Sequence, residues 1–136
     1  MQFIRELKRL EIWPEEFARA HGKSGTKKDR ELADLYTRYQ ERLTQHELYD
    51  AQGRFWSARA ELRKGQVRPF ERLRHVFVDG FTDFTRTEHE ILEILAGRTE
   101  SVSISLPLEQ DSPRRDLFAK SRQTLEELAR RHPGCE

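Results

Sequence analysis

His75-Val76-Phe77-Val78-Asp79-Gly80-Phe81-Thr82-Asp83-Phe84 is the stretch that decides the fold. A short apolar run ends abruptly at Asp79 and Gly80, which predicts a buried strand from about residue 74 to residue 79. Such a strand presents a carboxylate at its C-terminal end, where an open α/β sheet binds its ligands. A plain Asp-Gly turn explains the same residues, because glycine tolerates positive φ, and this alternative stays open.

The residues that follow predict one right-handed strand-helix-strand unit and a final helix. Thr85 and Glu88 form a capping-box signature, and Gly97 ends the helix that they begin. Apolar residues alternate with serines from Ser101 to Leu106, a period of two that is typical of a strand. A last helix is expected to start near Ser112-Pro113 and to end at His132. Its buried residues are expected to be Leu117, Phe118, Thr124, Leu125 and Leu128.

The chain before this stretch is expected to be helical. Apolar residues at helical spacing predict helices at residues 2–11, from Pro14, from Thr26 to a point between His46 and Asp50, and from the residue after Gly53 to Gly65. We therefore expect an α/β fold that is mostly helical. Its predicted parts are a helical segment at residues 1–66 and a strand-helix-strand-helix unit at residues 67–136.

The composition favours a helical protein with a small sheet and gives no general argument for nucleic-acid binding. Hydrophobic residues make up 35% and charged residues 36% of the 136 residues, which is polar for a domain with a large buried parallel sheet. The 25 basic and 24 acidic residues leave a formal charge of +1. Local basic groups such as Lys27-Lys28, Arg63-Lys64 and Arg130-Arg131 fit solvated helix ends better than phosphate clamps.

The single cysteine, Cys135, has no partner for a disulfide or a zinc site and indicates a reducing compartment. No apolar run is long enough to span a bilayer, and the N-terminus lacks a signal-peptide core. We therefore expect a soluble, cytoplasmic protein without a membrane partner. The histidines have no mutual spacing that suggests metal ligation; they are His21, His46, His75, His89 and His132.

Two further features suggest ligand sites but have simpler explanations. The loop from Gly22 to Thr26 lacks the preceding strand and the full spacing of a phosphate-binding loop. Several aromatic residues at helical spacing could stack on single-stranded bases, although core packing is the better interpretation. These aromatic residues are Trp13, Tyr36, Tyr39 and Trp56.

Three groups of residues follow one another in a specific order. The first comprises Phe3, Ile4, Lys8, Ile12, Pro14 and Glu15. The second comprises Tyr36, Tyr39, Gln40 and Leu43, followed by Leu48-Tyr49-Asp50. The third is Val78-Asp79-Gly80-Phe81-Thr82-Asp83. In this order, and over nearly the whole chain, they resemble the superfamily 1 helicases of the UvrD/RecB type.

Departures from that pattern narrow the resemblance. The second helicase motif is typically Val-Asp-Glu-Phe-Gln-Asp, but here Gly80 replaces the acid that activates water and Thr82 replaces the glutamine. The strand that ends at Leu106 is not followed by the usual Gly-Asp third motif. The Val-Asp-Gly-Phe version, together with Asp50-Ala51-x-Gly53-Arg54-Phe55, is similar to the B subunit of the AddAB helicase-nuclease. Related proteins of this branch carry a C-terminal PD-(D/E)XK nuclease domain.

The resemblance implies an internal fragment of a longer protein. Residues 1–66 would belong to the helicase 1B insertion and its return helix, and residues 67–136 to part of a RecA-like sheet of the P-loop NTPase type. In the parent protein, Asp79 would face the magnesium ion of bound ATP and Asp83 would position neighbouring loops. The resemblance implies no catalytic residue in this chain and no binding of ATP or Mg²⁺ by the fragment alone.

The implied function is a DNA-repair and recombination subunit with a degenerate second helicase motif, contributing to DNA binding and assembly. Its implied partners are DNA and a helicase-nuclease partner subunit. The isolated chain would have no enzymatic activity, whereas the parent would be an ATP-dependent helicase and exodeoxyribonuclease. Two alternatives remain: part of an active ATP-dependent DNA helicase, and a stand-alone helical interaction protein without catalysis.

Overall fold

A computed structural model describes residues 2–22, 25–65, 72–109 and 115–134. The fold is mostly helical with a small parallel sheet, as predicted, and the chain divides into unit 1, residues 1–60, and unit 2, residues 61–136. Three predicted features lie outside the described residues: the boundary after residue 66, the helix start at Ser112-Pro113, and Cys135. In the part of the chain that is described, no helix is long and apolar enough to cross a membrane.

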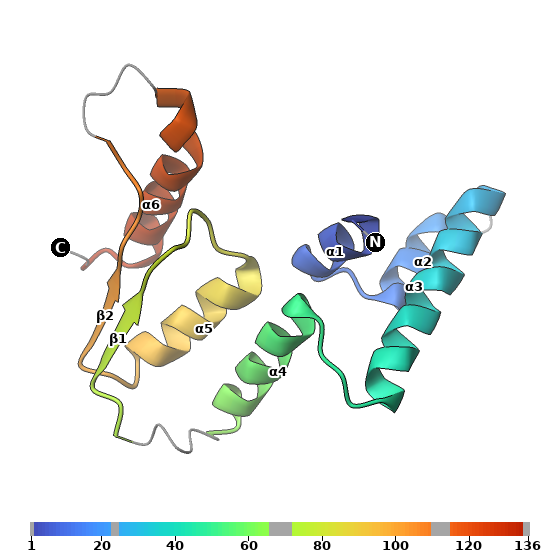
Figure 1. Ribbon diagram of the computed structural model, residues 1–136, viewed down its shortest axis with the longest axis horizontal. Coiled ribbons are helices and arrows are strands. Elements are labelled where there is room, and N and C mark those ends of the chain that lie inside the picture. The colour runs from blue at the N-terminus through green and yellow to red at the C-terminus, as the bar shows by residue number, and fades with distance from the viewer. Residues whose placement is uncertain (1, 23–24, 66–71, 110–114, 135–136) are drawn as a thin grey trace. The chain divides into compact units, whose positions relative to one another are not determined.

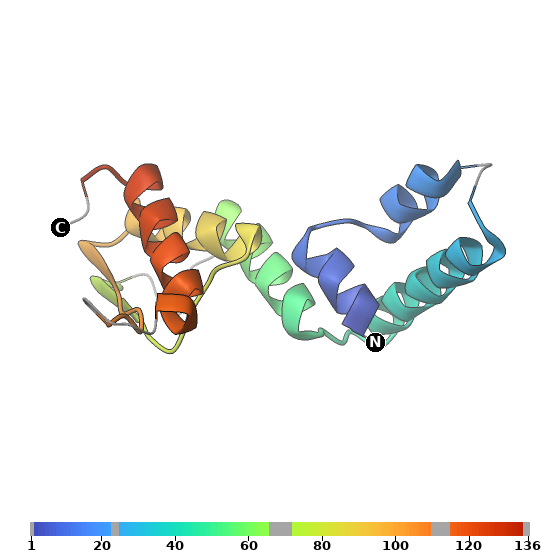
Figure 2. The same ribbon diagram turned by 90° about the horizontal axis from the view of Figure 1, so that it is seen from above.

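Unit 1 consists of helices whose ends follow from local sequence. They are α1 (Gln2–Arg9), α2 (Pro14–His21), α3 (Lys27–Gln45) and the first part of α4 (Ala51–Arg63). Thr26 and Asp29 form a reciprocal capping box at the start of α3, and Pro14 occupies the first turn of α2. Helix α1 ends earlier than predicted, because Glu11 adopts a positive φ of 57°. Helix α2 lies along α3 in both views (Figure 1 and Figure 2).

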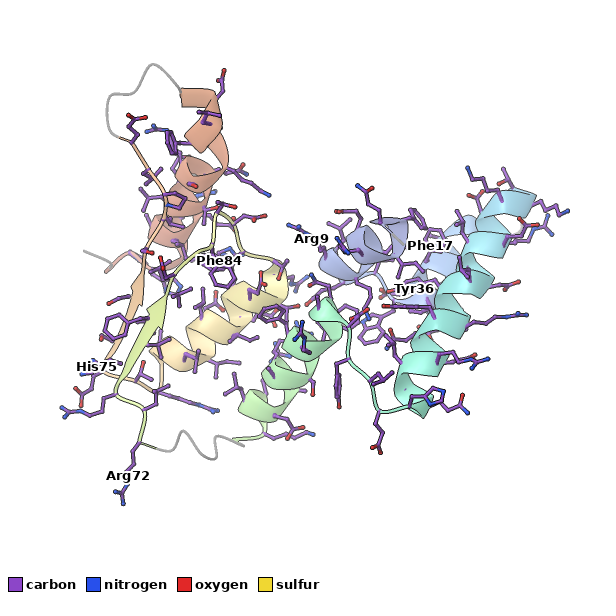
Figure 3. The ribbon with its side chains drawn as sticks, in the orientation of Figure 1. Arg9, Phe17, Tyr36, Arg72, His75 and Phe84 are labelled. Carbon is purple, nitrogen blue, oxygen red and sulfur yellow. The ribbon has the colours of Figure 1, made fainter. Side chains whose placement is uncertain are left out.

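The apolar core of unit 1 gathers around a tyrosine. It comprises Ile4, Leu7, Phe17, Ala33 and Tyr36. Tyr36 is fully buried, and its hydroxyl donates a hydrogen bond of 3.0 Å to the carbonyl of Ile12, so its polar atom is satisfied. Burial raises the pKa of Tyr36, with a further contribution from the charge of Asp50. Figure 3 labels Phe17 and Tyr36 in this core.

A buried ion pair connects three helices of unit 1. Lys8 of α1 is only 1% exposed, and its Nζ lies 2.8 Å from Asp50 Oδ2 and 2.9 Å from Gln40 Oε1. Asp50 also accepts hydrogen bonds from the Tyr39 hydroxyl at 2.8 Å and from the Gly53 amide at 2.7 Å. Burial alone would raise the pKa of Asp50, but the bonds from Lys8, Gly53 and Tyr39 together lower it. The carboxylate is therefore charged and fully partnered.

The surroundings of this ion pair leave little room for other residues. A Cβ at Gly53 would lie 3.0 Å from Asp50 Oδ1, so a larger residue would force the carboxylate to move. The ring centroid of Trp56 lies 4.8 Å from the Lys8 ammonium, within cation–π range. Burial and the hydrogen bond to Asp50 raise the pKa of Tyr39 to about 12. Because all the acceptors of the Lys8 ammonium come from α3 and the start of α4, the pair fixes how these helices meet α1.

Unit 2 contains the predicted strand-helix-strand unit. Its elements are β1 (His75–Val78), α5 (Arg86–Ala96), β2 (Ser101–Ile104), the short 3-10 helix η2 (Arg115–Phe118) and α6 (Ala119–Arg131). The strands are parallel, with His75 opposite Ser101 and Val78 opposite Ile104. Thr85 and Glu88 form the predicted capping box of α5, which packs beside the sheet (Figure 1).

Two expectations about burial in unit 2 were wrong. Strand β1 is not buried on both faces: Val76 and Val78 are half-buried, whereas Phe77 is 80% exposed. In the last helical region, Leu117 and Leu125 are exposed while Thr124 and Leu128 are buried. Leu117 belongs to η2, and a 3-10 turn has three residues per turn, so it does not continue the apolar face of α6.

Replacing Lys8 with methionine should destabilise the chain by about 3 kcal/mol, because Asp50 keeps its charge in a largely buried position without its cation. Urea unfolding followed by circular dichroism measures this loss. Lys27→Met is the matched control, because Lys27 is 89% exposed beside Glu31, and such pairs contribute less than about 1 kcal/mol. Equal effects of the two substitutions would contradict the importance of the buried pair.

Candidate functional site

The candidate site lies where the two parallel strands end. Since Val78 is opposite Ile104, the next residues, Asp79 and Ser105, emerge at the same edge of the sheet. The Ser105 amide donates a hydrogen bond of 2.9 Å to the Val78 carbonyl, and the Ser105 hydroxyl donates one to the Asp79 carboxylate. The structure thus places Asp79 at the end of β1, where the sequence predicted, and its partner Ser105, directly after β2, was not identified in the sequence analysis.

The turn after Asp79 depends on a glycine. Gly80 has a φ of 81°, in the left-handed region that side chains with a Cβ rarely adopt. A Cβ built at Gly80 meets no atom within 4 Å, so the obstacle to a larger residue is backbone strain and not lack of space. The turn conformation therefore disfavours a glutamate at the position that the helicase resemblance assigns to a water-activating acid.

Helix α6 contacts the loop that joins β1 to α5. The Thr124 hydroxyl donates a hydrogen bond of 2.9 Å to the carbonyl of Thr82, and Thr124 is only 5% exposed. The Lys120 ammonium lies 2.8 Å from Asp83 Oδ2. Both sequence-predicted acids, Asp79 and Asp83, thus have protein partners.

Aromatic side chains of the same loop pack against one another and against His89 of α5. Phe81 and Phe84 stack with ring centroids 5.2 Å apart, and the edge of His89 lies against Phe84 at 5.5 Å. Figure 3 labels Phe84 beside α5. His89 is 3% exposed, and neither ring nitrogen has a hydrogen-bond partner, although Nε2 lies 3.5 Å from Glu127 Oε1. Burial lowers the pKa of His89, an effect that the charge of Glu127 opposes.

The resemblance to helicases implies a magnesium ion at this edge, and the residues present fit it poorly. Magnesium is bound through one or two carboxylates and the oxygens of substrate phosphates. Asp79 is exposed and retains oxygen lone pairs beyond the one that Ser105 occupies, but Asp83 already has an ammonium group at 2.8 Å. The described residues contain no group of three or more metal-binding side chains. The pair of acids therefore does not form a ready cation site.

The aromatic residues considered for base stacking are mostly part of the core. Tyr36 and Trp56 are buried, and Tyr39 is engaged with Asp50. Trp13 is 41% exposed and packs on Trp56 with ring centroids 4.4 Å apart. Core packing thus explains Tyr36, Tyr39 and Trp56, whereas Trp13 is in contact with Trp56 and partly open to solvent.

Several of the basic groups are engaged in ion pairs with acids of the same chain. Arg63 pairs with Glu90 at 2.7 Å, and Arg74 pairs with Glu100 at 2.6 Å. His75 Nδ1 lies 2.9 Å from the Ser101 hydroxyl across the parallel strands, at the start of β1. These pairs reduce the positive charge that each group offers to a ligand.

The candidate site includes three residues that the sequence analysis did not assign to it: Ser105, Lys120 and Thr124. The sequence signal that could have identified Ser105 was the period-two pattern, which predicted this serine on the second strand. Lys120 and Thr124 lie four residues apart on one helix, but nothing local in the sequence indicates which loop that helix face meets.

The chain was compared with known protein families. The family model described as "ADDB, N-terminal" matches residues 1–132. No curated protein and no solved structure matches the chain.

Acidification should destabilise the chain through His89. An unfolded histidine has a pKa near 6.5, and the folded value is lower, so the unfolded chain takes up a proton first as the pH falls. The stability due to neutral His89 is therefore complete above about pH 6.5 and is lost as the pH falls through the lowered folded pKa. Thermal unfolding at about pH 7.5 and about pH 5.5 measures this loss.

His89→Leu should reduce the pH dependence, because the buried titrating group is gone. His46→Gln is the control, since His46 is exposed after the end of α3, and it should leave the pH dependence unchanged. A pH dependence that persists undiminished in His89→Leu would assign the effect to another group.

Proposed function

The chain belongs to the AddB N-terminal family, and we propose that it is part of an AddB-type subunit of a DNA-repair helicase-nuclease. Its proposed role is to bind DNA and to support assembly with a helicase partner subunit, without catalysing a reaction itself. The observation that carries the non-catalytic assignment is Gly80, which replaces the water-activating acid and has a positive φ. ATP, Mg²⁺ and nuclease chemistry belong, on this proposal, to other parts of the assembly.

The left-handed backbone of Gly80 gives a second argument for the non-catalytic role, besides the absence of a side chain. Positioned acids and bases orient the attacking nucleophile in phosphoryl transfer, and glycine offers no such group. Restoring an acid there would also require a left-handed backbone that costs about 1 kcal/mol or more for a residue with a Cβ. The loop is thus suited to a structural role.

The exposed face of the small sheet supports the proposal that the chain is a piece of a RecA-like domain in a longer superfamily 1 protein. Parallel sheets are normally covered on both faces, and two strands alone make a marginal sheet. Here Phe77 is 80% exposed on a strand whose alternate residues, Val76 and Val78, are half-buried. In the proposed parent, further elements would cover this face, and residues 1–66 would form the 1B-type insertion.

The DNA-binding role predicts affinity that depends steeply on salt, because phosphate contacts release counterions. We expect binding of duplex ends or single strands by the chain or by the longer protein, measured by fluorescence anisotropy at several salt concentrations. The slope of log affinity against log salt should be about −0.9 per duplex phosphate contact. Undetectable binding at low salt for both proteins would count heavily against the DNA-binding role.

One observation supports the alternative function, an active helicase: Asp79 lies exposed at the end of β1. On our proposal, Asp79→Ala in the longer protein leaves its ATP turnover unchanged, and Gly80→Glu does not raise it. Steady-state phosphate release measures both. Asp34→Ala, an exposed change on α3, is the matched control. Turnover that falls in Asp79→Ala and persists in Asp34→Ala would favour the active helicase.

A further inference from the structure

Two residues of α6 hold the loop between β1 and α5 through different contacts. Thr124 and Lys120 lie one turn apart on the helix, and the loop rises beside α6 in Figure 1. The Thr124 hydroxyl lies 2.9 Å from the Thr82 carbonyl and 3.0 Å from the Lys120 carbonyl of its own helix, so its one proton is shared between them. The Lys120 ammonium lies 2.8 Å from Asp83. Neighbouring loop residues are therefore bound by a buried hydroxyl and a partly exposed ammonium group.

The hydrogen bond and the ion pair contribute in different ways. Thr124 is 5% exposed although Thr82 is exposed, so loss of the Thr124 hydroxyl removes a contact that the loop makes with a buried position of α6. The side chains of Lys120 and Asp83 are 60% and 29% exposed, so their pair adds little stability. The hydroxyl accordingly positions the loop, and the ammonium mainly determines its charge.

Lys120 lies near the start of α6, which continues directly from η2, and its side chain is 60% exposed. The nearby acid that compensates for the charge of Lys120 is Asp83, which belongs to the loop. The Lys120 ammonium already contacts the Asp83 carboxylate, so it would repel a second cation that approached this carboxylate.

We propose that Lys120 is the built-in counter-ion of Asp83 and that Thr124 is a positioning residue, so that α6 holds the loop without a bound cation or nucleotide. This inference rests on the proposed function only in identifying the loop as a former nucleotide-binding element. The contacts themselves are independent of DNA binding. Lys120 is thus the specific reason why these acids do not form a magnesium site.

Nuclear magnetic resonance of the full chain tests the counter-ion, with Mn²⁺ alone as the probe. Paramagnetic broadening of the Thr82 and Asp83 amide signals reports cation binding at the loop. In Lys120→Met, broadening should occur at a Mn²⁺ concentration about three- to tenfold lower than in the parent chain, because one partly exposed repelling charge is removed. Lys120→Arg keeps the charge, and Arg122→Met removes an exposed cation of the same helix; both should behave like the parent chain.

Amide chemical shifts test the positioning role in the same samples. Thr124→Val should shift the Asp83 amide signal, because the Thr82 carbonyl of the same peptide group loses the hydroxyl contact, and Thr124→Ser should restore the parent shift. Equal Mn²⁺ dependence in Lys120→Met and Arg122→Met, or no broadening in any variant, would overturn the proposal that Lys120 is the counter-ion of Asp83. An unchanged Asp83 shift in Thr124→Val would overturn the positioning role of Thr124. None of these measurements involves DNA, so failure of the DNA-binding proposal would leave them interpretable.

Discussion

The parallel pairing of β1 with β2 is the constraint on which the candidate site depends. Its register sets Val78 opposite Ile104, so Asp79 and Ser105 emerge together at the C-terminal edge. The chain must then turn away from the sheet before α5 begins, and Gly80 permits this through its positive φ. The hydroxyl-to-carboxylate bond, the turn and the loop all follow from that register. A shift by one residue would move the half-buried valines to the exposed face.

The chemistry of the loop is determined by the groups already bound to its polar atoms. In a nucleotide-binding protein, acids at this edge remain available for a metal ion or for water. Here the Ser105 hydroxyl donates a hydrogen bond to the Asp79 carboxylate, and the Lys120 ammonium pairs with the Asp83 carboxylate. The sheet edge thus has the position of a nucleotide-binding edge, but both of its acids have protein partners. Position in the fold alone would have suggested nucleotide chemistry, whereas these partners support the structural loop that we propose.

Features set by residues close in sequence could be predicted, and features set by distant partners could not. The capping box of Thr85 and Glu88 and the alternation around Ser101–Ile104 are local patterns, and both gave the right elements. The bond from Thr124 to Thr82 spans 42 positions, and no periodicity encodes which loop a helix face will meet. The exposure of Phe77 is a similar case, because an apolar run indicates a strand but not what covers each face.

In unit 1, the residues that carry the family resemblance have a physical role in packing the helices. The residues that carried the resemblance there include Lys8, Tyr39, Gln40, Asp50 and Gly53, and these form one buried polar network. A buried cation requires all its acceptors in place, so such a network restricts how its helices can pack, whatever the protein binds. The resemblance in unit 1 is therefore evidence about packing. Evidence about activity has to come from the loop after β1, where Gly80 departs from the helicase pattern and two residues of α6 contact the loop.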